Sequence, residues 1–480
     1  MIHEKLRILS TEQITQIHDA TLRTFEEVGL QVMHEEGRKM WIGWGARQDE
    51  KTNRIHIPAH LVEKALKTVP SQILCGAREV KNELVIGDGK VYGRNGGGPG
   101  QVTDMETGDL RNATRSDAAD YARLVDGLVN THIAAPVYEQ ESAPETRDLH
   151  TLAWMFRNTS KHINIRLLKP TSLPYFIRMA EILSGGKQAL KQKPVITLLE
   201  SPIAPLKHPD VLIDSILTCG EYGIPLEICS MPIAGATGPI TLAGSLLMSN
   251  VEMMGAVVFG QLAYPGMPMI ITPRIMVMDM ASGTALTGTM ENALLVTAGS
   301  QLAKEAYHMP VNMHGPYTDS PLNDSQAGIE NTYFSLMPAM AGADILTGAG
   351  HLQGGLVVNF AQLVMDDELV GLVNRAIQGL EVNEESLGFE AVKASIESDN
   401  LLMHPHTLKH MRSDRYRTKL MTRVARATWE ADGSKSMRDR AIEKVKALLA
   451  QHEPKPLDEN TQTGINELLI EADQKLVSKP

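Results

Sequence analysis

Short apolar runs and amphipathic stretches alternate regularly along the middle of the chain. Eight apolar runs bounded by polar or turn residues have the length and composition of buried β-strands. They cover residues 90–94, 131–138, 162–168, 194–201, 225–231, 267–275, 310–317 and 343–350. The runs are followed by stretches with apolar residues three and four positions apart, which predict helices, most clearly at 116–129, 145–159, 208–222 and 290–307.

This alternation of strand and helix predicts parallel strands joined by crossover helices. Eight units within residues 87–380 match a closed (β/α)8 TIM barrel, which we expect to be the catalytic domain, better than an open doubly wound sheet. Residues 1–86 predict a mostly helical N-terminal addition. Residues 381–480 are charged and helical in pattern, and they predict a C-terminal helical cap and a tail whose last amphipathic stretch could pack on a neighbouring subunit.

Composition narrows the class of protein. With 480 residues, 43% hydrophobic and 21% charged, the chain can bury a substantial core. Its net charge of -11 provides no basic field for phosphate, so nucleic acid is not expected as a partner. The start MIHEKLRILSTEQ lacks the apolar core of a signal peptide, and no apolar run continues for about 20 residues. We therefore expect a cytoplasmic protein without a membrane segment.

Polar residues that follow the apolar runs are the first candidates for chemistry, because a barrel of this type carries its active site at the C-terminal ends of its strands. These residues are Arg94 and Asn95, Tyr138 and Glu139, Arg166, Glu200, Met231 and Pro232, Arg274 and Asp279, His314, Tyr317 and Asp319, and Gly348 to His351. Asp344 directly precedes the last run. It should lie at the opposite end of the barrel, and we exclude it from the site.

Two glycine-rich segments follow the first and fifth runs. RNGGGPGQ contains Gly96, Gly97 and Gly98, where the backbone could approach a ligand closely. It is not a dinucleotide fingerprint, because Pro99 and a turn-like segment follow it instead of a helix. SMPIAGATGPITLAG contains Gly235 and places small residues where a bulky cofactor or a partner could approach the mouth. Both segments also fit ordinary turns at the barrel rim.

Metal binding receives little support from the spacing of potential ligands. The chain has no HExxH motif, and its three cysteines, Cys75, Cys219 and Cys229, form no CxxC pair. We expect Cys219 and Cys229 to be buried packing residues and no metal to be tightly bound. A metal-dependent hydrolase or lyase remains an alternative if His314, His351 and a carboxylate converge.

Four segments, in the same order along the chain, carry a resemblance to a known family. They are RNGGGPGQVTDMETGDLRNATRSD, PIAGATGPITLAG, DSQAGIENTYFSLMPAMAGADILTGAGHLQGGL and HPHTLKHMRSDRYRTKL. With them the chain resembles the trimethylamine methyltransferase family of corrinoid-dependent enzymes. Founding members carry pyrrolysine and demethylate trimethylamine, whereas the larger branch lacks it and includes glycine betaine enzymes. This chain has no pyrrolysine, and the counterpart of that region lies near Tyr317 to Leu322.

The resemblance implies transfer of a methyl group from a quaternary amine, such as glycine betaine or a proline betaine-like compound, to cob(I)alamin on a cognate corrinoid protein. Cobalamin would be carried by that partner, and no residue of this chain is assigned as a nucleophile. The resemblance also implies a homo-oligomer. Carnitine, γ-butyrobetaine or another methylated amine remain alternative substrates, and a barrel that binds without catalysis remains an alternative function.

The resemblance also sorts the candidate residues by role. A cationic ammonium group would lie against aromatic faces and carboxylates, for which we expect Tyr138 with Glu139 and Tyr317 with Asp319. A carboxylate of the substrate would be held by Arg94, Arg274, His314 or His351. Cobalamin would approach over Gly96, Gly97, Gly98 and Gly235. Either arginine could instead pair with a carboxylate inside the barrel, and the two tyrosines could be packing residues.

Overall fold

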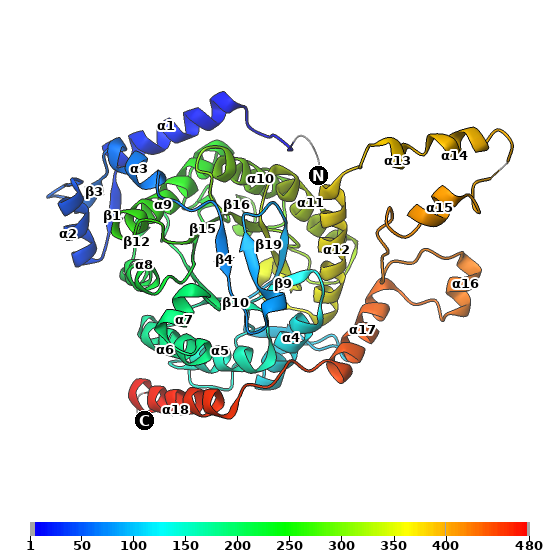
Figure 1. Ribbon diagram of the computed structural model, residues 1–480. Coiled ribbons are helices and arrows are strands. Elements are labelled where there is room, and N and C mark those ends of the chain that lie inside the picture. The colour runs from blue at the N-terminus through cyan, green and yellow to red at the C-terminus, as the bar shows by residue number, and fades with distance from the viewer. Residues whose placement is uncertain (1–4, 399, 478–480) are drawn as a thin grey trace.

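Eight parallel strands form a closed barrel at the centre of the molecule, seen end-on in Figure 1. The computed structural model describes residues 5–398 and 400–477. A bridge between Ile271 and Val311 closes the sheet, whose order is β15-β13-β11-β10-β9-β6-β19-β18. The strands are β6 (Tyr92–Asn95), β9 (Thr131–Ala134), β10 (His162–Arg166), β11 (Ile196–Glu200), β13 (Leu226–Ser230), β15 (Met269–Pro273), β18 (Asn312–His314) and β19 (Ile345–Ala349). Each predicted apolar run coincides with one strand, with β6 ending one residue beyond its run, and the predicted TIM barrel is confirmed.

A helix follows every barrel strand and packs on the outside of the barrel (Figure 1). These helices are α4 (Arg115–Gly127), α5 (Arg147–Asn158), α6 (Leu173–Ser184), α8 (Asp210–Tyr222), α9 (Leu242–Ala263), α10 (Met290–Glu305), α11 (Ser325–Ala341) and α12 (Phe360–Gln378), with the short α7 (Lys187–Gln192) after α6. Hydroxyl side chains begin several of them: Thr114 and Thr289 accept hydrogen bonds from N–H groups of the first turn of α4 and α10. By length and composition α9 alone among the described helices could span a membrane, and most of it is buried inside the molecule.

The N-terminal end of the barrel is closed by an apolar plug. Strands β4 (Ile73–Cys75) and β5 (Leu84–Ile86) form an antiparallel hairpin there. Its buried side chains form one cluster with the lowest inward-facing layer of the barrel, contributed by Tyr92, Ile133, Ile270 and Ile345. Because inward-facing residues alternate along each strand, the next layers toward the C-terminal end include Arg94, Asn164, Glu227, Thr272 and Asn312. The apolar plug thus leaves the polar layers facing the mouth.

The residues before the plug combine helices with short strands. The elements are α1 (Thr11–Glu27), β1 (Leu30–Val32), α2 (Glu35–Trp44), β2 (Arg47–Gln48), β3 (Arg54–His56), α3 (Ala59–Leu66) and, between the hairpin strands, η1 (Val80–Asn82). Strand β1 pairs antiparallel with β3 and parallel with β12 (Lys207–His208), which belongs to the loop after β11. The helical pattern of this region did not reveal these strands, which are two or three residues long.

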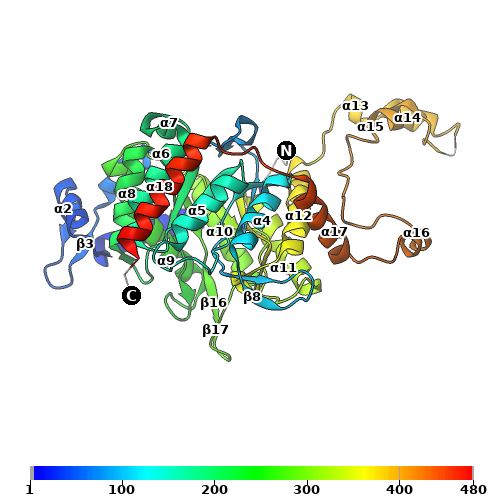
Figure 2. The ribbon, with the colours of Figure 1, turned by 90° about the horizontal axis from the view of Figure 1, so that it is seen from below.

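Two small sheets stand around the mouth of the barrel, at the lower edge of Figure 2. One contains β14 (Ile233–Ala234), β16 (Met276–Asp279) and β17 (Thr284–Leu286). The other contains β7 (Gln101–Thr103), β8 (Leu110–Asn112), β20 (His351–Leu352) and β21 (Val357–Val358), with η3 (Gln353–Gly355) between the last two. Both are built from the loops that follow barrel strands, so they form the rim of the site.

The C-terminal region divides into two parts. Helix α17 (Met437–Gln451) packs against α12 and α4, and α18 (Glu459–Leu476) packs against α5 and α6 of its own chain, with Arg178 and Glu471 2.8 Å apart. Residues 380–435, which we call the arm, instead project from the barrel (Figures 1 and 2). The arm contains α13 (Glu384–Leu387), α14 (Phe389–Ala394), α15 (Pro405–His410) and α16 (Arg426–Ala431). The cap predicted from residue 381 therefore packs on the barrel through its last two helices and through the short segment 419–421, whose backbone N–H groups donate to the carboxylate of Glu368 on α12.

Candidate active site

A buried carboxylate occupies the centre of the barrel. Glu227 of β13 accepts hydrogen bonds from Asn164 Nδ2 at 2.6 Å, Thr272 Oγ1 at 2.9 Å and Asn312 Nδ2 at 2.9 Å. The donors come from β10, β15 and β18, so one side chain joins four strands of the barrel. These three hydrogen bonds to one carboxylate fix the polar layer beneath the mouth.

Two arginines lie within 4 Å of this carboxylate. The closest approaches to Glu227 Oε1 are 3.9 Å from Arg94 Nη1 and 3.7 Å from Arg274 Nη2, which are ion pairs too long for hydrogen bonds. Burial, opposed by the charge of Glu227, lowers the pKa of Arg94 to about 10, so its guanidinium stays charged at neutral pH. Arg94 Nε, Arg274 Nε and Arg274 Nη2 are buried without a hydrogen-bond partner among the described residues. Pairing with a carboxylate inside the barrel, which was the alternative for these arginines, therefore leaves some nitrogens of each guanidinium group without a partner.

An aromatic cluster forms the wall beside the arginines. The rings of His314 and Tyr317 stack with centroids 4.1 Å apart, and His351 meets Tyr317 edge-on at 5.5 Å. Burial, together with the charges of Arg274 and Arg94, lowers the pKa of His351 to about 3 and that of His314 well below its usual value. Both imidazoles are therefore neutral, and neither ring nitrogen of His351 has a hydrogen-bond partner among the described residues.

The hydroxyl of Tyr317 is already engaged: it donates to the carbonyl oxygen of Gly354 at 2.7 Å. Tyr138 likewise donates to the carbonyl oxygen of Arg166 at 2.5 Å. Burial raises the pKa of both tyrosines. Their hydroxyls are thus neutral donors held by the backbone, and the ring faces are what each tyrosine offers to the site.

The two acidic residues expected beside the tyrosines are engaged with loop backbone. Glu139 is fully buried, and its Oε2 accepts from the N–H groups of Glu141 and Ser142 at 2.6 and 2.9 Å. Asp319 accepts from the N–H groups of Thr287 and Gly288 at 3.1 and 2.7 Å. These carboxylates tie the loops after β9 and β18 into shape, and Glu139 Oε1 keeps a free acceptor position in the described structure.

The glycines of the rim differ in what lies next to them. A Cβ on Gly96 would lie 2.1 Å from the His351 ring, so this glycine lets the imidazole rest on the backbone. A Cβ on Gly97 would meet Ala135 at 2.5 Å, whereas one on Gly98 would meet nothing within 4 Å. Gly235 adopts a φ of +90° and packs beside Ile240 and Met280. Of the four, only Gly98 has open space beside its Cα.

Several side chains at the centre of the site were not among the residues chosen from the sequence. They are Asn164, Glu227, Cys229, Thr272 and Asn312. Cys229 had been interpreted as a packing residue, yet its thiol is close enough to Arg274, Glu227, Arg166 and Arg94 for their charges to affect its pKa, which burial raises. The sequence does contain a signal for these residues. Each of them interrupts an apolar run and stands two or four positions before the residue chosen at the end of that run, which places both on the same, inward-facing side of the strand.

The rim around the mouth is partly apolar. Met231 follows β13, Met280 lies at the turn between β16 and β17, and Leu322 and Leu356 lie in the loops after β18 and β19, all of them exposed. In the part of the chain that the structure describes, no three His, Cys, Asp or Glu side chains are arranged to hold a metal ion. The site thus combines a deep carboxylate, buried guanidinium groups with unpaired nitrogens, aromatic faces and an apolar rim.

Comparison with known proteins places this chain in a family. The family model for trimethylamine methyltransferase (MTTB) matches residues 2–475. The trimethylamine methyltransferase MttB of Desulfitobacterium hafniense is 32% identical over 467 residues, which cover 97% of this chain and 94% of that protein. The MttB of Methanosarcina barkeri is 30% identical over 476 residues, with 98% and 96% covered. A glycine betaine methyltransferase of D. hafniense is 28% identical over 457 residues, with 95% and 94% covered.

The fold is also found among solved structures. The crystal structure of the monomethylamine methyltransferase MtmB of M. barkeri superposes with a TM-score of 0.53 at 13% identity, and the match covers all of this chain and 90% of that one. At this identity the likeness supports the barrel architecture alone. The family model and the similar proteins together show that the chain belongs to the trimethylamine methyltransferase family.

Proposed function

We propose that the chain transfers a methyl group from a quaternary amine that carries a carboxylate, such as glycine betaine or a proline betaine-like compound, to cob(I)alamin on a cognate corrinoid protein in the cytoplasm. One observation supports the carboxylate above all. The mouth of the barrel buries guanidinium nitrogens of Arg94 and Arg274 without hydrogen-bond partners among the described residues. A buried charged donor without an acceptor is costly, and a planar carboxylate is the acceptor that guanidinium groups fit best.

Trimethylamine fits this site less well, since it has no anionic group to satisfy the arginines. The family also contains a protein named as a glycine betaine methyltransferase, which is similar to this chain over 95% of its length. In the proposed complex the substrate carboxylate lies against Arg274 and Arg94. The ammonium lies against the ring of Tyr138 and the face of Tyr317 that is not stacked on His314, where the attraction between a cation and an aromatic ring stabilises it.

The methyl transfer needs no acid from this chain. The carbon–nitrogen bond breaks with its electron pair staying on nitrogen, so the amine leaves as a neutral tertiary amine, and the methyl group forms a new bond to cobalt(I). The corrinoid supplies that nucleophilic chemistry when the partner docks. The barrel residues bind and orient the amine, and the neutral rings of His314 and His351 help to exclude water from the reacting group. The apolar rim with Met280 and Leu356 and the open backbone at Gly98 are where we propose that the partner brings cobalamin.

The test is to mix the purified protein with cob(I)alamin and single amines, and to follow absorbance as the methylated corrinoid forms. The panel contains glycine betaine, proline betaine, carnitine and γ-butyrobetaine, with trimethylamine and tetramethylammonium as amines that lack a carboxylate. We expect transfer from at least one carboxylate-bearing amine and none from the other two. Transfer from tetramethylammonium as fast as from the betaines would contradict the role of the arginines, and no transfer at all, even with a corrinoid protein from the same organism, would refute the reaction.

A pair of variants separates binding from turnover. Arg274→Gln removes the guanidinium with the most unpaired nitrogens, and we expect KM for the betaine to rise at least about tenfold, with a smaller change in kcat. The matched control is Arg178→Gln, on α6 at the outside of the barrel, where the arginine pairs with Glu471. An unchanged KM in Arg274→Gln would exclude this arginine as the carboxylate site.

A further inference from the structure

The arm exposes apolar side chains at an unusual density. Eleven of the 28 exposed large apolar side chains found in the described residues lie in the arm, which is 56 residues of the 480. Ile396 is 87% exposed, Met403 79% and Leu402 73%. Among the described residues of the arm, 380–398 and 400–435, only Ala391 and Leu420 are buried apolar residues. The arm therefore lacks a core that could stabilise its short helices, and it needs a surface to pack against.

The exposed area of the whole chain also indicates that part of its surface is covered by another molecule. A compact monomer of 52.6 kDa is expected to expose about 17,600 Å². This chain exposes 21601 Å². The excess of about 4,000 Å² belongs to one chain, and it is more than one partner contributes to an obligate interface, which buries about 2,000–5,000 Å² summed over both partners. The surface that covers the arm is therefore expected to be large and permanent.

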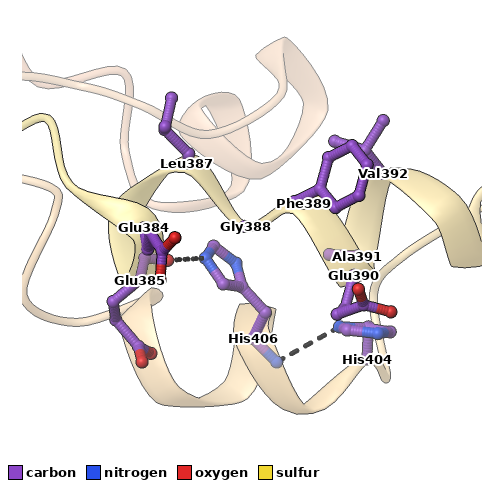
Figure 3. Close-up of a pocket in the computed structure, with 10 residues that line it drawn as sticks. All are labelled: Glu384, Glu385, Leu387, Gly388, Phe389, Glu390, Ala391, Val392, His404 and His406. Atoms are coloured by element: carbon purple, nitrogen blue, oxygen red, sulfur yellow. Dashed lines mark hydrogen bonds between the residues drawn. The ribbon is translucent and has the colours of Figure 1, made fainter.

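The arm also has a shape that can receive another chain. A hollow of about 720 Å³ lies between α13, α14 and the start of α15. Figure 3 shows Leu387, Phe389 and Val392 on one side of it and His404 and His406 on the other. His406 Nε2 donates to the carbonyl oxygen of Glu385, 3.1 Å away, and this hydrogen bond holds the two limbs of the arm together. The apolar side of the hollow is open to a partner.

Charge indicates what that partner is. The arm contains nine Lys and Arg and nine Asp and Glu, so the net charge of -11 lies entirely on the rest of the chain. The basic residues are concentrated in 404–426, with seven Lys and Arg against one Asp. Arg412, Arg415, Arg417 and Arg423 make no ion pair with any described residue. A basic limb on an otherwise acidic protein is complementary to the body of a second copy.

The position of the arm argues against the mouth as its binding surface. In Figure 2 the mouth sheet with β16 and β17 points downward, whereas the arm leaves the side of the barrel beside α12 and α17. A protein that docks on the mouth would leave the arm uncovered.

From these observations we infer that the arm is an interaction surface for a second copy of this chain, in which the exposed apolar residues and the basic limb of one arm lie on the acidic body of the neighbouring copy. This inference assigns the contact between copies of the chain to a specific segment, residues 380–435. The inference does not depend on which amine is the substrate.

The test uses the full-length protein. Light scattering after size-exclusion chromatography should give at least twice 52.6 kDa for the unaltered chain. Ile396→Glu combined with Leu402→Glu should reduce this to the mass of one chain, with the melting temperature of the barrel retained. Val80→Glu is the matched control, since Val80 is 74% exposed but lies in η1 at the plug end of the barrel, and its mass should stay unchanged. High salt should also favour the single chain, because it screens the basic limb.

Hydrogen exchange of residues 380–435 provides the second measurement, with slow exchange expected in the unaltered oligomer and fast exchange in the double variant. Three results would overturn the inference: a monomeric unaltered chain, an oligomer that persists in the double variant, or an arm that becomes protected only after a corrinoid protein is added.

Discussion

Removing the central carboxylate should destabilise the barrel strongly. In Glu227→Gln the side chain keeps its size but loses its charge, and two buried guanidinium groups at 3.7 and 3.9 Å lose their counterion. Each ion pair corresponds to about 4 kcal/mol of attraction at an effective dielectric constant of about 20. Because breaking a buried pair leaves charge uncompensated, we expect the free energy of unfolding to fall by about 3–5 kcal/mol. The new amide group also faces three hydrogen-bond donors, of which it can accept fewer than the carboxylate does.

The matched control is the same substitution on the next strand. Glu200 is almost as buried, but it lies on the outward-facing side of β11, and burial raises its pKa to about 7. Its carboxyl group is therefore already half protonated at neutral pH, and glutamine resembles the neutral form. We expect Glu200→Gln to change the free energy of unfolding by less than about 1 kcal/mol.

The assay is urea unfolding of both variants at pH 7, followed by circular dichroism. A second measurement is calorimetric titration with the betaine identified in the methyl-transfer panel. Without the negative charge below them, Arg94 and Arg274 should hold a carboxylate more tightly, by roughly tenfold. Equal stability of the two variants, or weaker binding in Glu227→Gln with its fold intact, would refute the idea that Glu227 is the counterion of the two arginines.

Three further predictions concern other parts of the molecule. Gly96→Ala would place a Cβ 2.1 Å from the His351 ring, so we expect methyl transfer to be lost and the melting temperature to fall, whereas Gly43→Ala, with no atom within 4 Å of the new Cβ, should raise stability by about 0.5–1 kcal/mol. Burial lowers the pKa of His162 to about 4, so the unaltered protein loses stability as the pH falls below about 6.5, the value in the unfolded chain. His162→Asn lacks this titration, so the difference in unfolding free energy between the unaltered protein and the variant, measured by urea unfolding, should shrink by about 1.3 kcal/mol between pH 7.5 and pH 5.5. Asp344→Asn, at the plug end, should cost about 3–5 kcal/mol of unfolding free energy because it breaks a buried ion pair, yet leave kcat of the folded protein unchanged, and a tenfold loss of kcat would contradict this.

The barrel could be predicted from the sequence because its strands are buried on both faces. The runs at 194–201 and 267–275, for example, are continuous apolar segments between turn residues, and their order with the intervening helices admits few topologies. The arm could not be predicted, because the pattern of a charged segment such as 404–426 predicts helices but does not show whether they pack against the barrel. In the structure residues 404–426 contain one short helix, α15, which Pro405 begins and no regular apolar stripe extends, before α16 starts at Arg426.

The candidate site was predicted in its outline but not at its centre. Arg94, Arg274, His314 and His351 follow strands, and position alone selected them. Glu227 lies inside a strand, and the residues next to it in the sequence do not indicate which side chains will contact its carboxylate. Its partners Asn164, Thr272 and Asn312 are between 45 and 85 residues away in sequence, and only closure of the barrel brings them together.

The order of charges along the barrel axis gives the proposed reaction a direction. The plug end is apolar, Glu227 lies in the polar layers nearer the mouth, and both guanidinium groups lie within 4 Å of its carboxylate, with Arg274 directly after the C-terminal end of β15. A zwitterionic amine entering this field is oriented, because its carboxylate is attracted inward to the arginines. The distance between carboxylate and ammonium in the substrate then sets how close the methyl group comes to the mouth. Betaines with longer spacers should therefore differ from glycine betaine mainly in kcat, and a panel in which they differ only in KM would contradict this arrangement.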